Sequence, residues 1–205
     1  MQAVEMSRDE THNGARLILV RHGESEGNRD RTFTQSPEVP LTPNGREQVR
    51  ATAERIVASY APARIVASPY TRARQTAEII GALLALPVEL EAAFREQSFG
   101  VLAGQPYDTV LRDAAYHDGP RWQWRPPGGE SLMDVSARVV PAFERLAGAA
   151  AGQDVVVVSH GGVMLALCAH VTGSWDGLSV TPNAGVVVVE RRRGRYAPPH
   201  AVVND

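Results

Sequence analysis

Short apolar runs divide this chain at regular intervals. Four of them are apolar at almost every position, which is typical of strands buried on both faces: residues 17–20, 65–67, 155–158 and 186–189. Longer segments with helical periodicity separate these runs, over residues 41–60, 70–86, 130–150 and 161–171. This alternation predicts an α/β fold, a three-layer α/β/α arrangement with a mostly parallel central sheet. The last run, followed by a basic turn, predicts an antiparallel edge strand.

Local signals indicate where two of the helices begin or bend. Thr42 is an N-cap candidate, and Pro43 stands in the first turn that follows it. Pro141 falls inside the third helical segment, where a proline removes a backbone donor, so we expect a kink there. The stretch PPGGES at 126–131 reads as a loop leading into that helix.

Basic side chains follow the ends of the predicted strands. Arg21 and His22 come directly after the first run, His160 and Gly161 follow the third, and Arg72 stands in the opening turn of the helix after the second. The carboxyl ends of parallel strands meet at one edge of a sheet, where ligands bind, so these side chains are expected to converge. Helix N-termini at the same edge add backbone N–H groups and a partial positive charge. The pattern therefore favours a site for phosphate or another oxyanion.

A metal site is the alternative that two histidines and a nearby carboxylate leave open. Two guanidinium groups within a few ångströms repel a divalent cation, whereas their forked donors match phosphate oxygens. We therefore predict no metal ligands in this chain.

Composition limits the partners and the number of domains. With 205 residues and 43% apolar residues, the chain is expected to form one domain, residues 16–205, preceded by a flexible tail over residues 1–15. The formal net charge of -2 gives no general reason to bind nucleic acid, so the basic stretch at 190–196 is interpreted as a solvated hairpin tip rather than a nucleic-acid patch. Neither a monomer nor a homodimer is favoured by the sequence.

Membrane and secretion signals are missing from the pattern. No apolar stretch approaches the roughly 20 residues that span a bilayer, and the acidic N-terminal segment lacks the apolar core of a signal peptide. The one cysteine, Cys168, allows no intramolecular disulfide. We therefore expect a cytoplasmic protein that does not bind membranes.

Five motifs together resemble a known family. LVRHGESEGN, LTPNG, SPYTRARQTA, PGGES and VVSHGG occur in this order, from about residue 17 to residue 189. Their order and spacing are similar to those of the histidine phosphatase superfamily, which includes phosphoglycerate mutase-like enzymes and small phosphatases. The resemblance implies a phosphatase of the small branch that uses neither metal nor organic cofactor.

The resemblance also implies roles for particular residues. His22 corresponds to the nucleophile that carries the phosphoryl group, with a ring oriented through its other nitrogen. Arg21, Arg72 and His160 correspond to the pocket that stabilises the transferring phosphoryl oxygens. Glu96, in FREQSFG, corresponds to the general acid that protonates the leaving group and then activates water.

Further residues are expected to contact the substrate. Asn28 corresponds to another donor of the phosphate pocket, and Thr34 and Gln35 fall where relatives contact the rest of the substrate. Gly161 and Gly23, which follow the two histidines, are expected to let the backbone turn sharply and approach a ligand closely.

Hydrolysis is favoured over isomerisation by what lies near Glu96. Mutases of the family usually carry an arginine directly after the glutamate, where this chain has Gln97, and a longer basic segment before PGGES. The alternatives are a mutase-type phosphotransfer isomerase and a phospho-ligand or partner-binding module without turnover. Trp122 and Trp124 fit two interpretations, an aromatic wall over the site or the packing of a lid. A small-molecule phosphate monoester is the expected partner.

Overall fold

The computed structural model describes residues 14–34, 36–150 and 152–202. The strands are β1 (Gly14–Arg21), β2 (Pro62–Ala67), β3 (Val88–Leu90), β4 (Asp154–Ser159), β5 (Val186–Arg192), β6 (Arg195–Tyr196) and β7 (His200–Val202). The α-helices are α1 (Glu26–Arg29), α2 (Pro43–Ser59), α3 (Thr71–Leu84), α4 (Leu132–Ala149) and α5 (Gly161–Thr172). Four short 3₁₀ helices lie between β3 and α4: η1 (Ala92–Phe94), η2 (Gly100–Leu102), η3 (Tyr107–Arg112) and η4 (Ala114–Tyr116).

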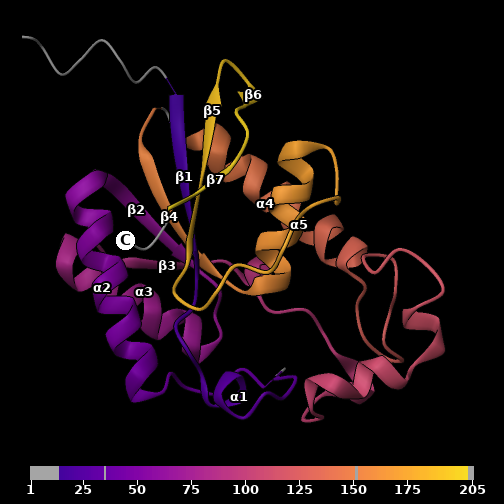
Figure 1. Cartoon of the computed structure of the whole chain (residues 1–205). Helices are drawn as coiled ribbons and strands as arrows, with labels where there is room; N and C mark the ends of the chain where they lie inside the picture. The colour runs from indigo at the N-terminus through magenta and orange to yellow at the C-terminus, as the bar shows by residue number, and fades with distance from the viewer. Residues whose placement is uncertain (1–13, 35, 151, 203–205) are drawn as a thin grey trace, which may run out of the picture.

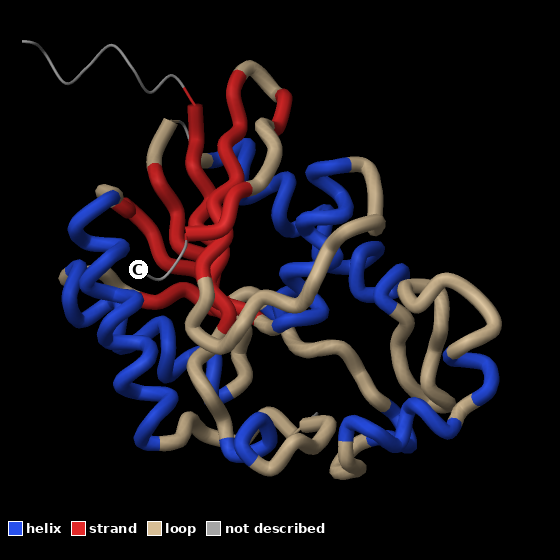
Figure 2. Tube along the Cα trace, in the orientation of Figure 1, coloured by secondary structure: helices blue, strands red, loops and turns tan. Residues whose placement is uncertain are grey.

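A mixed sheet forms the centre of the structure (Figure 2). Its order is β3-β2-β4-β1-β5-β6, with β7 also paired to β5. Strands β1, β2, β3 and β4 pair in parallel, and β5 runs antiparallel to β1. The prediction of a mostly parallel sheet with an antiparallel strand is confirmed. That strand, β5, is not itself the edge, because β6 and β7 pair with its outer side.

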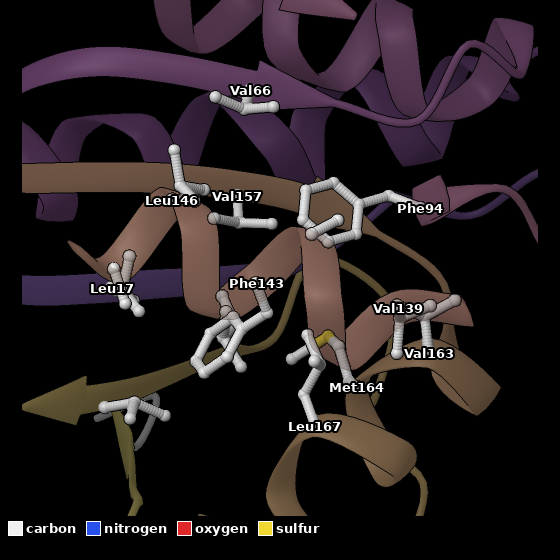
Figure 3. Close-up of a cluster of buried hydrophobic side chains, with 14 of the residues drawn as sticks. Leu17, Val66, Phe94, Val139, Phe143, Leu146, Val157, Val163, Met164 and Leu167 are labelled. Carbon is white, nitrogen blue, oxygen red and sulfur yellow. The ribbon is translucent and has the colours of Figure 1, made fainter. Parts of the chain in front are cut away.

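Helices cover both faces of the sheet, so the predicted three-layer arrangement is confirmed (Figure 1). Helices α2 and α3 pack on one face, and α4 and α5 pack on the other. Figure 3 shows the core on the face covered by α4 and α5, where Phe94, Phe143 and Met164 pack against Leu17 and Val157 of the sheet. Burial on both faces explains why the runs in β1 and β4 are uniformly apolar.

The helix starts follow the local sequence. The Thr42 side chain accepts a hydrogen bond from the Gly45 amide at 2.9 Å, and α2 begins at Pro43 as predicted. Helix α4 begins after Ser131, whose side chain accepts from the Asp134 amide. It continues through Pro141 to Ala149. No helix in the described part of the chain is long and apolar enough to cross a membrane.

The N-terminal boundary differs slightly from the prediction. Gly14 and Ala15 belong to β1, so the sheet begins two residues before the expected start of the domain at residue 16. The other residues of the expected tail, 1–13, lie outside the described residues. No helical or strand periodicity is visible in the sequence between residues 92 and 116, and the structure has only the four short 3₁₀ helices there.

Two glycines bring the end of β1 onto the start of α2. A Cβ atom on Gly23 would overlap the carbonyl oxygen of Gly45, and a Cβ atom on Gly45 would overlap the backbone of Glu24. Gly23 does not have the positive φ of a sharp glycine turn, which corrects our expectation for this residue. Its small size is needed because two backbones meet here.

Arg138 of α4 holds the segment that carries Glu96. Its guanidinium donates to the carbonyl oxygens of Ala93, Arg95 and Glu96 at 2.6, 3.0 and 3.0 Å. It also donates to both carboxylate oxygens of Glu130, which in turn accepts from the Ser98 amide at 2.9 Å. Residues 93–98 are thus bound to α4 through Arg138 and to the loop before α4 through Glu130.

We predict that Gly45→Ala destabilises the protein by about 2 to 3 kcal/mol, because the added methyl group collides with backbone that cannot move aside. Gly148→Ala is the matched control in another helix, where the nearest atom to the new Cβ is an Arg191 nitrogen 4.0 Å away. It is expected to be neutral or to stabilise by up to about 1 kcal/mol. Urea unfolding of both variants measures the difference, and equal effects would contradict the close contact.

Replacing Arg138 by alanine is expected to cost about 2 to 4 kcal/mol, because it leaves three carbonyl groups and part of the Glu130 carboxylate without their donor. Arg145→Ala on the same helix is the control. Its side chain is 68% exposed and its ion pair with Glu91 is 3.5 Å long, so a loss below about 1 kcal/mol is expected. A loss of that small size in the Arg138 variant would mean that these hydrogen bonds do not hold the segment.

Candidate active site

The basic side chains at the strand ends converge as predicted. His22 follows β1, His160 follows β4 and precedes α5, and Arg72 stands in the first turn of α3. The two imidazole rings are 5.1 Å apart between centroids. One nitrogen of each ring and one carboxylate oxygen of Glu96 lie within 4.8 Å of one another. Residues separated by up to 138 positions therefore share one small site.

The His22 ring is held in one orientation and one tautomer. Its Nδ1 lies 2.7 Å from the carbonyl oxygen of Gly23, an atom that only accepts, so Nδ1 carries the proton. Its Nε2 carries no proton in this tautomer, and its electron pair accepts a hydrogen bond from Nε of Arg72 at 3.2 Å. Burial, together with the charges of Arg72 and Arg21, lowers the pKa of His22 well below its usual value. The ring is therefore neutral at physiological pH, and it is oriented through its other nitrogen as expected, with a backbone carbonyl as the partner.

Two guanidinium groups, that of the buried Arg72 and that of the partly buried Arg21, stand beside this ring. Arg72 is 2% exposed and donates to the carbonyl oxygens of Ser36 and Thr34, both at 3.2 Å. Arg21 donates to the carbonyl oxygen of Thr181 at 2.7 Å, while its Nε finds no hydrogen-bond partner within the described part of the chain. Buried cations with spare donors attract an anion.

His160 lies between Ser68 and Glu96, with one ring nitrogen facing each of them. Its Nε2 lies 2.8 Å from Oγ of Ser68, and its Nδ1 lies 3.4 Å from Oε2 of Glu96. Burial is the largest cause that lowers the pKa of His160 well below its usual value, followed by the charge of Arg72. If the Ser68 hydroxyl donates to Nε2, the proton of the neutral ring is on Nδ1 and points toward Glu96.

Glu96 is brought to the two histidines by the segment that Arg138 holds. Its Oε2 lies 3.7 Å from Arg72, and its Oε1 accepts from the Gln97 amide at 2.9 Å. The side chain is only 11% exposed, and this burial raises the pKa of the carboxyl although Arg72 and the Gln97 amide act in the opposite direction. Glu96 therefore has the environment of a carboxyl that keeps a proton at higher pH than an ordinary glutamate.

The Asn28 side chain is oriented by hydrogen bonds at both its oxygen and its nitrogen. Its Oδ1 accepts from the Ser25 amide at 3.2 Å and from the Asn183 side chain at 2.9 Å, and its Nδ2 donates to the Tyr107 hydroxyl at 3.2 Å. Asn183 also donates to the carbonyl oxygen of His22 at 3.1 Å. This arrangement leaves an N–H of Asn28 available to the site.

The other predicted contact residues have different outcomes. Thr34 and Gly161 line the same cavity as His22, and a Cβ atom on Gly161 would lie 2.8 Å from Val180. Gly161 does not have a positive φ, so its closeness to a neighbouring side chain, rather than a sharp turn, accounts for the glycine. Gln35 lies outside the described residues.

Ser68 and Asn183 hold the site and were not predicted. Ser68 opens the SPYTRARQTA motif directly after β2, at a strand end like the two histidines. Its place in the site could therefore have been predicted from its position at a strand end. Asn183 gave no signal, because it lies 161 positions from His22 in a loop without periodicity.

The ligand atoms of His22, His160 and Glu96 are close enough to hold a metal ion. Against this, the electron pair of His22 Nε2 accepts from Arg72, and the guanidinium of Arg72 is also 3.7 Å from the Glu96 carboxylate. A permanent cation at these distances opposes a divalent cation and favours an anion. The prediction of no metal ligands stays open to a test with a chelator.

Comparison with known proteins agrees with this geometry. Residues 17–201 match the model of the histidine phosphatase superfamily (branch 1). A glucosyl-3-phosphoglycerate phosphatase of Mycolicibacterium vanbaalenii is 35% identical over 188 residues, covering 84% of this chain and 82% of its own length. A 2,3-bisphosphoglycerate-dependent phosphoglycerate mutase of Methylobacterium radiotolerans is 35% identical over 161 residues, covering 74% and 76%.

Solved structures show the same fold. A mycobacterial glucosyl-3-phosphoglycerate phosphatase superposes with a TM-score of 0.79 at 28% identity, covering 90% of this chain and 96% of that one. The Bacillus stearothermophilus protein YhfR superposes with a TM-score of 0.81 at 26% identity, covering 93% and 96%. The motifs at the strand ends, the match along nearly the whole chain and the shared fold agree: this protein belongs to the histidine phosphatase superfamily.

Proposed function

We propose that this protein hydrolyses phosphate monoesters through a phosphohistidine intermediate on His22. The observation that carries the proposal is the fixed, neutral His22 ring, whose Nε2 electron pair stands beside the buried guanidinium of Arg72. A neutral imidazole is a nucleophile, and a guanidinium next to it attracts the phosphate group that it attacks. Membership of a superfamily with phosphatases among the similar proteins supports the same activity.

In the first step, the electron pair of His22 Nε2 forms a bond to phosphorus while the ester P–O bond breaks. Arg21, Arg72, His160 and the amide of Asn28 supply donors for the phosphoryl oxygens. The leaving alkoxide takes a proton from the carboxyl of Glu96, whose raised pKa suits this role. The alcohol then leaves, and Glu96 remains as a carboxylate.

In the second step, water attacks the phosphorus of phosphohistidine. The Glu96 carboxylate takes a proton from this water, the Nε2–P bond breaks, and inorganic phosphate leaves. His22 and Glu96 return to their starting protonation states. Both steps use groups that lie within one small site, and neither needs a metal or an organic cofactor.

Two alternatives remain open to the experiments below. A mutase returns the phosphoryl group to a second hydroxyl, and mutases occur among the similar proteins. In this chain Gln97 follows Glu96 and donates to the carbonyl oxygen of Glu130 at 2.6 Å, so no extra cation is supplied there. A binding module without turnover is the second alternative. We propose a small-molecule monoester as partner and the cytoplasm as location, with neither nucleic acid nor membrane involved.

His22→Ala is expected to lower kcat/KM for p-nitrophenyl phosphate by at least about a thousandfold, because the nucleophile is lost. Wild-type activity is expected to persist in excess EDTA. His200→Ala, which removes an exposed histidine from β7, is the control and is expected to keep wild-type activity.

Loss of wild-type activity in EDTA would show a metal site instead. Product formation only with a second acceptor alcohol would support a mutase, and no turnover of any ester would support a binding module.

Glu96→Gln is expected to lower kcat/KM for ethyl phosphate by about a hundredfold or more and for p-nitrophenyl phosphate by less than about tenfold, since nitrophenolate leaves without a proton. We compare kcat/KM because it reports the transfer to His22, whereas the later attack of water uses Glu96 with both esters. The pH profile gives a second readout. With the pKa of Glu96 raised, hydrolysis of ethyl phosphate falls as pH rises through that value. With the pKa of His22 lowered, the acidic decline lies below the usual imidazole pKa, so the optimum is on the acid side of neutral. Equal losses on both esters, or an alkaline decline that survives in Glu96→Gln, would remove Glu96 from this role.

A further inference from the structure

The site opens into a cavity much larger than a phosphate group. The cavity has a volume of about 760 Å³ and extends from His22 and Arg72 to the segment of 3₁₀ helices and the loop after α5. Pockets of this size hold drug-sized ligands, so the alcohol part of an ester has room beside the reacting atoms. The residues around this space therefore bear on which alcohol is accepted.

Several aromatic side chains line this cavity. We call four of them the aromatic wall: Tyr116, Trp122, Trp124 and Trp175. Aliphatic side chains, among them Leu178 and Val180, line the same space. Aromatic rings have large apolar faces that bind other rings by stacking or edge contact.

The rings of the wall are held by contacts between distant segments. Trp122 stacks on Trp175, with centroids 6.0 Å apart and planes at 7°. Trp124 meets Tyr116 edge to face at 5.2 Å, and its indole N–H donates to Asp113 at 3.1 Å. The polar atom of Trp124 is thus already bonded, and its apolar ring remains for the cavity. Trp122 and Trp124 thus combine the two interpretations given above, because each ring lines the cavity and each also packs on another aromatic ring.

The wall offers little that binds a charged or sugar-like group. Among the described residues that line the cavity, Glu96 is the only acidic one, and Arg121 is the only cation besides Arg21 and Arg72. Arg121 is exposed and lies over the Tyr116 ring at 5.3 Å, so solvent screens its charge. Several lining residues carry polar side chains, but Ser25, Asn28 and Gln97 already bond to other protein groups. An apolar ring needs no hydrogen-bonding partner when it leaves water.

From this lining we infer the substrate class: phosphate monoesters of uncharged alcohols that carry an apolar ring. The ring lies against the aromatic wall while the phosphate group lies at Arg21, His22 and Arg72. This inference rests on the proposed hydrolysis, and it adds the identity of the leaving alcohol.

The test compares kcat/KM for 3-phenylpropyl phosphate and ethyl phosphate. Both esters release a primary alkoxide, so the chemical step is matched and the ratio reports the contacts of the ring. Wild type is expected to prefer the phenylpropyl ester by at least about tenfold, which is less than the full burial of a phenyl ring provides. Trp122→Ala and Trp175→Ala are expected to lower this ratio at least about fivefold, while Trp122→Phe retains most of it.

Leu111→Ala is the matched control for these variants. Leu111 is an apolar residue of η3, 57% exposed and not part of the cavity lining, so its removal is expected to leave the ratio unchanged. If the alanine variants do not fold, inhibition of wild type gives the same comparison without mutation. There, 3-phenylpropylphosphonate is expected to bind at least about tenfold more tightly than ethylphosphonate, since neither has a P–O ester bond to break.

Equal kcat/KM for the two esters would overturn the inference, as would a preference for glucose 6-phosphate or 3-phosphoglycerate over the phenylpropyl ester. In either case hydrolysis itself would stand, so the proposed function would survive. A complete lack of hydrolysis of every ester, p-nitrophenyl phosphate included, would overturn the proposed function and this inference together.

Discussion

The hydrogen bond from His22 Nδ1 to the carbonyl oxygen of Gly23 is the interaction on which the site depends. It fixes the proton of the neutral ring on Nδ1 and leaves the electron pair of Nε2 at the position where Arg72 stands. Without it, the ring can turn or exchange tautomers, and the arginines then gather an anion that nothing attacks. The burial that lowers the pKa of His22 acts in the same sense, because it keeps the ring neutral beside two cations.

The fold serves this interaction by bringing distant segments to one edge of the sheet. Strands β1 and β4 end side by side and deliver the two histidines, and α3 delivers Arg72 from its first turn. The tight approach of Gly23 to Gly45 holds the peptide that accepts the His22 proton. Arg138 holds the Glu96 segment from the opposite face, so the nucleophile and the carboxyl are positioned by different layers of the structure.

The parts of this structure that the sequence predicts are those that depend on close neighbours. The apolar runs of β1 and β4 and the start of α2 at Thr42 and Pro43 need only a few residues each to be recognised. The resemblance to a family then assigned roles to His22 and Glu96. In contrast, β3 is only three residues long and has two exposed side chains. The sequence of the segment that forms the 3₁₀ helices shows no regular spacing of apolar residues. The bond from Asn183 to His22 and the stacking of Trp122 on Trp175 join segments far apart in the chain, so they become visible only in the folded structure.

The most direct test of the proposed phosphohistidine mechanism is to identify the atom that carries the phosphoryl group. Enzyme mixed with p-nitrophenyl phosphate and quenched in alkali, where phosphohistidine survives, can be digested and its phosphopeptide analysed by mass spectrometry and ³¹P NMR. We predict a phosphoryl group on His22, bound to Nε2, because Nδ1 is occupied by its bond to Gly23. A phosphoryl group on Nδ1 or on another residue, or turnover without any phosphoenzyme, would contradict the mechanism.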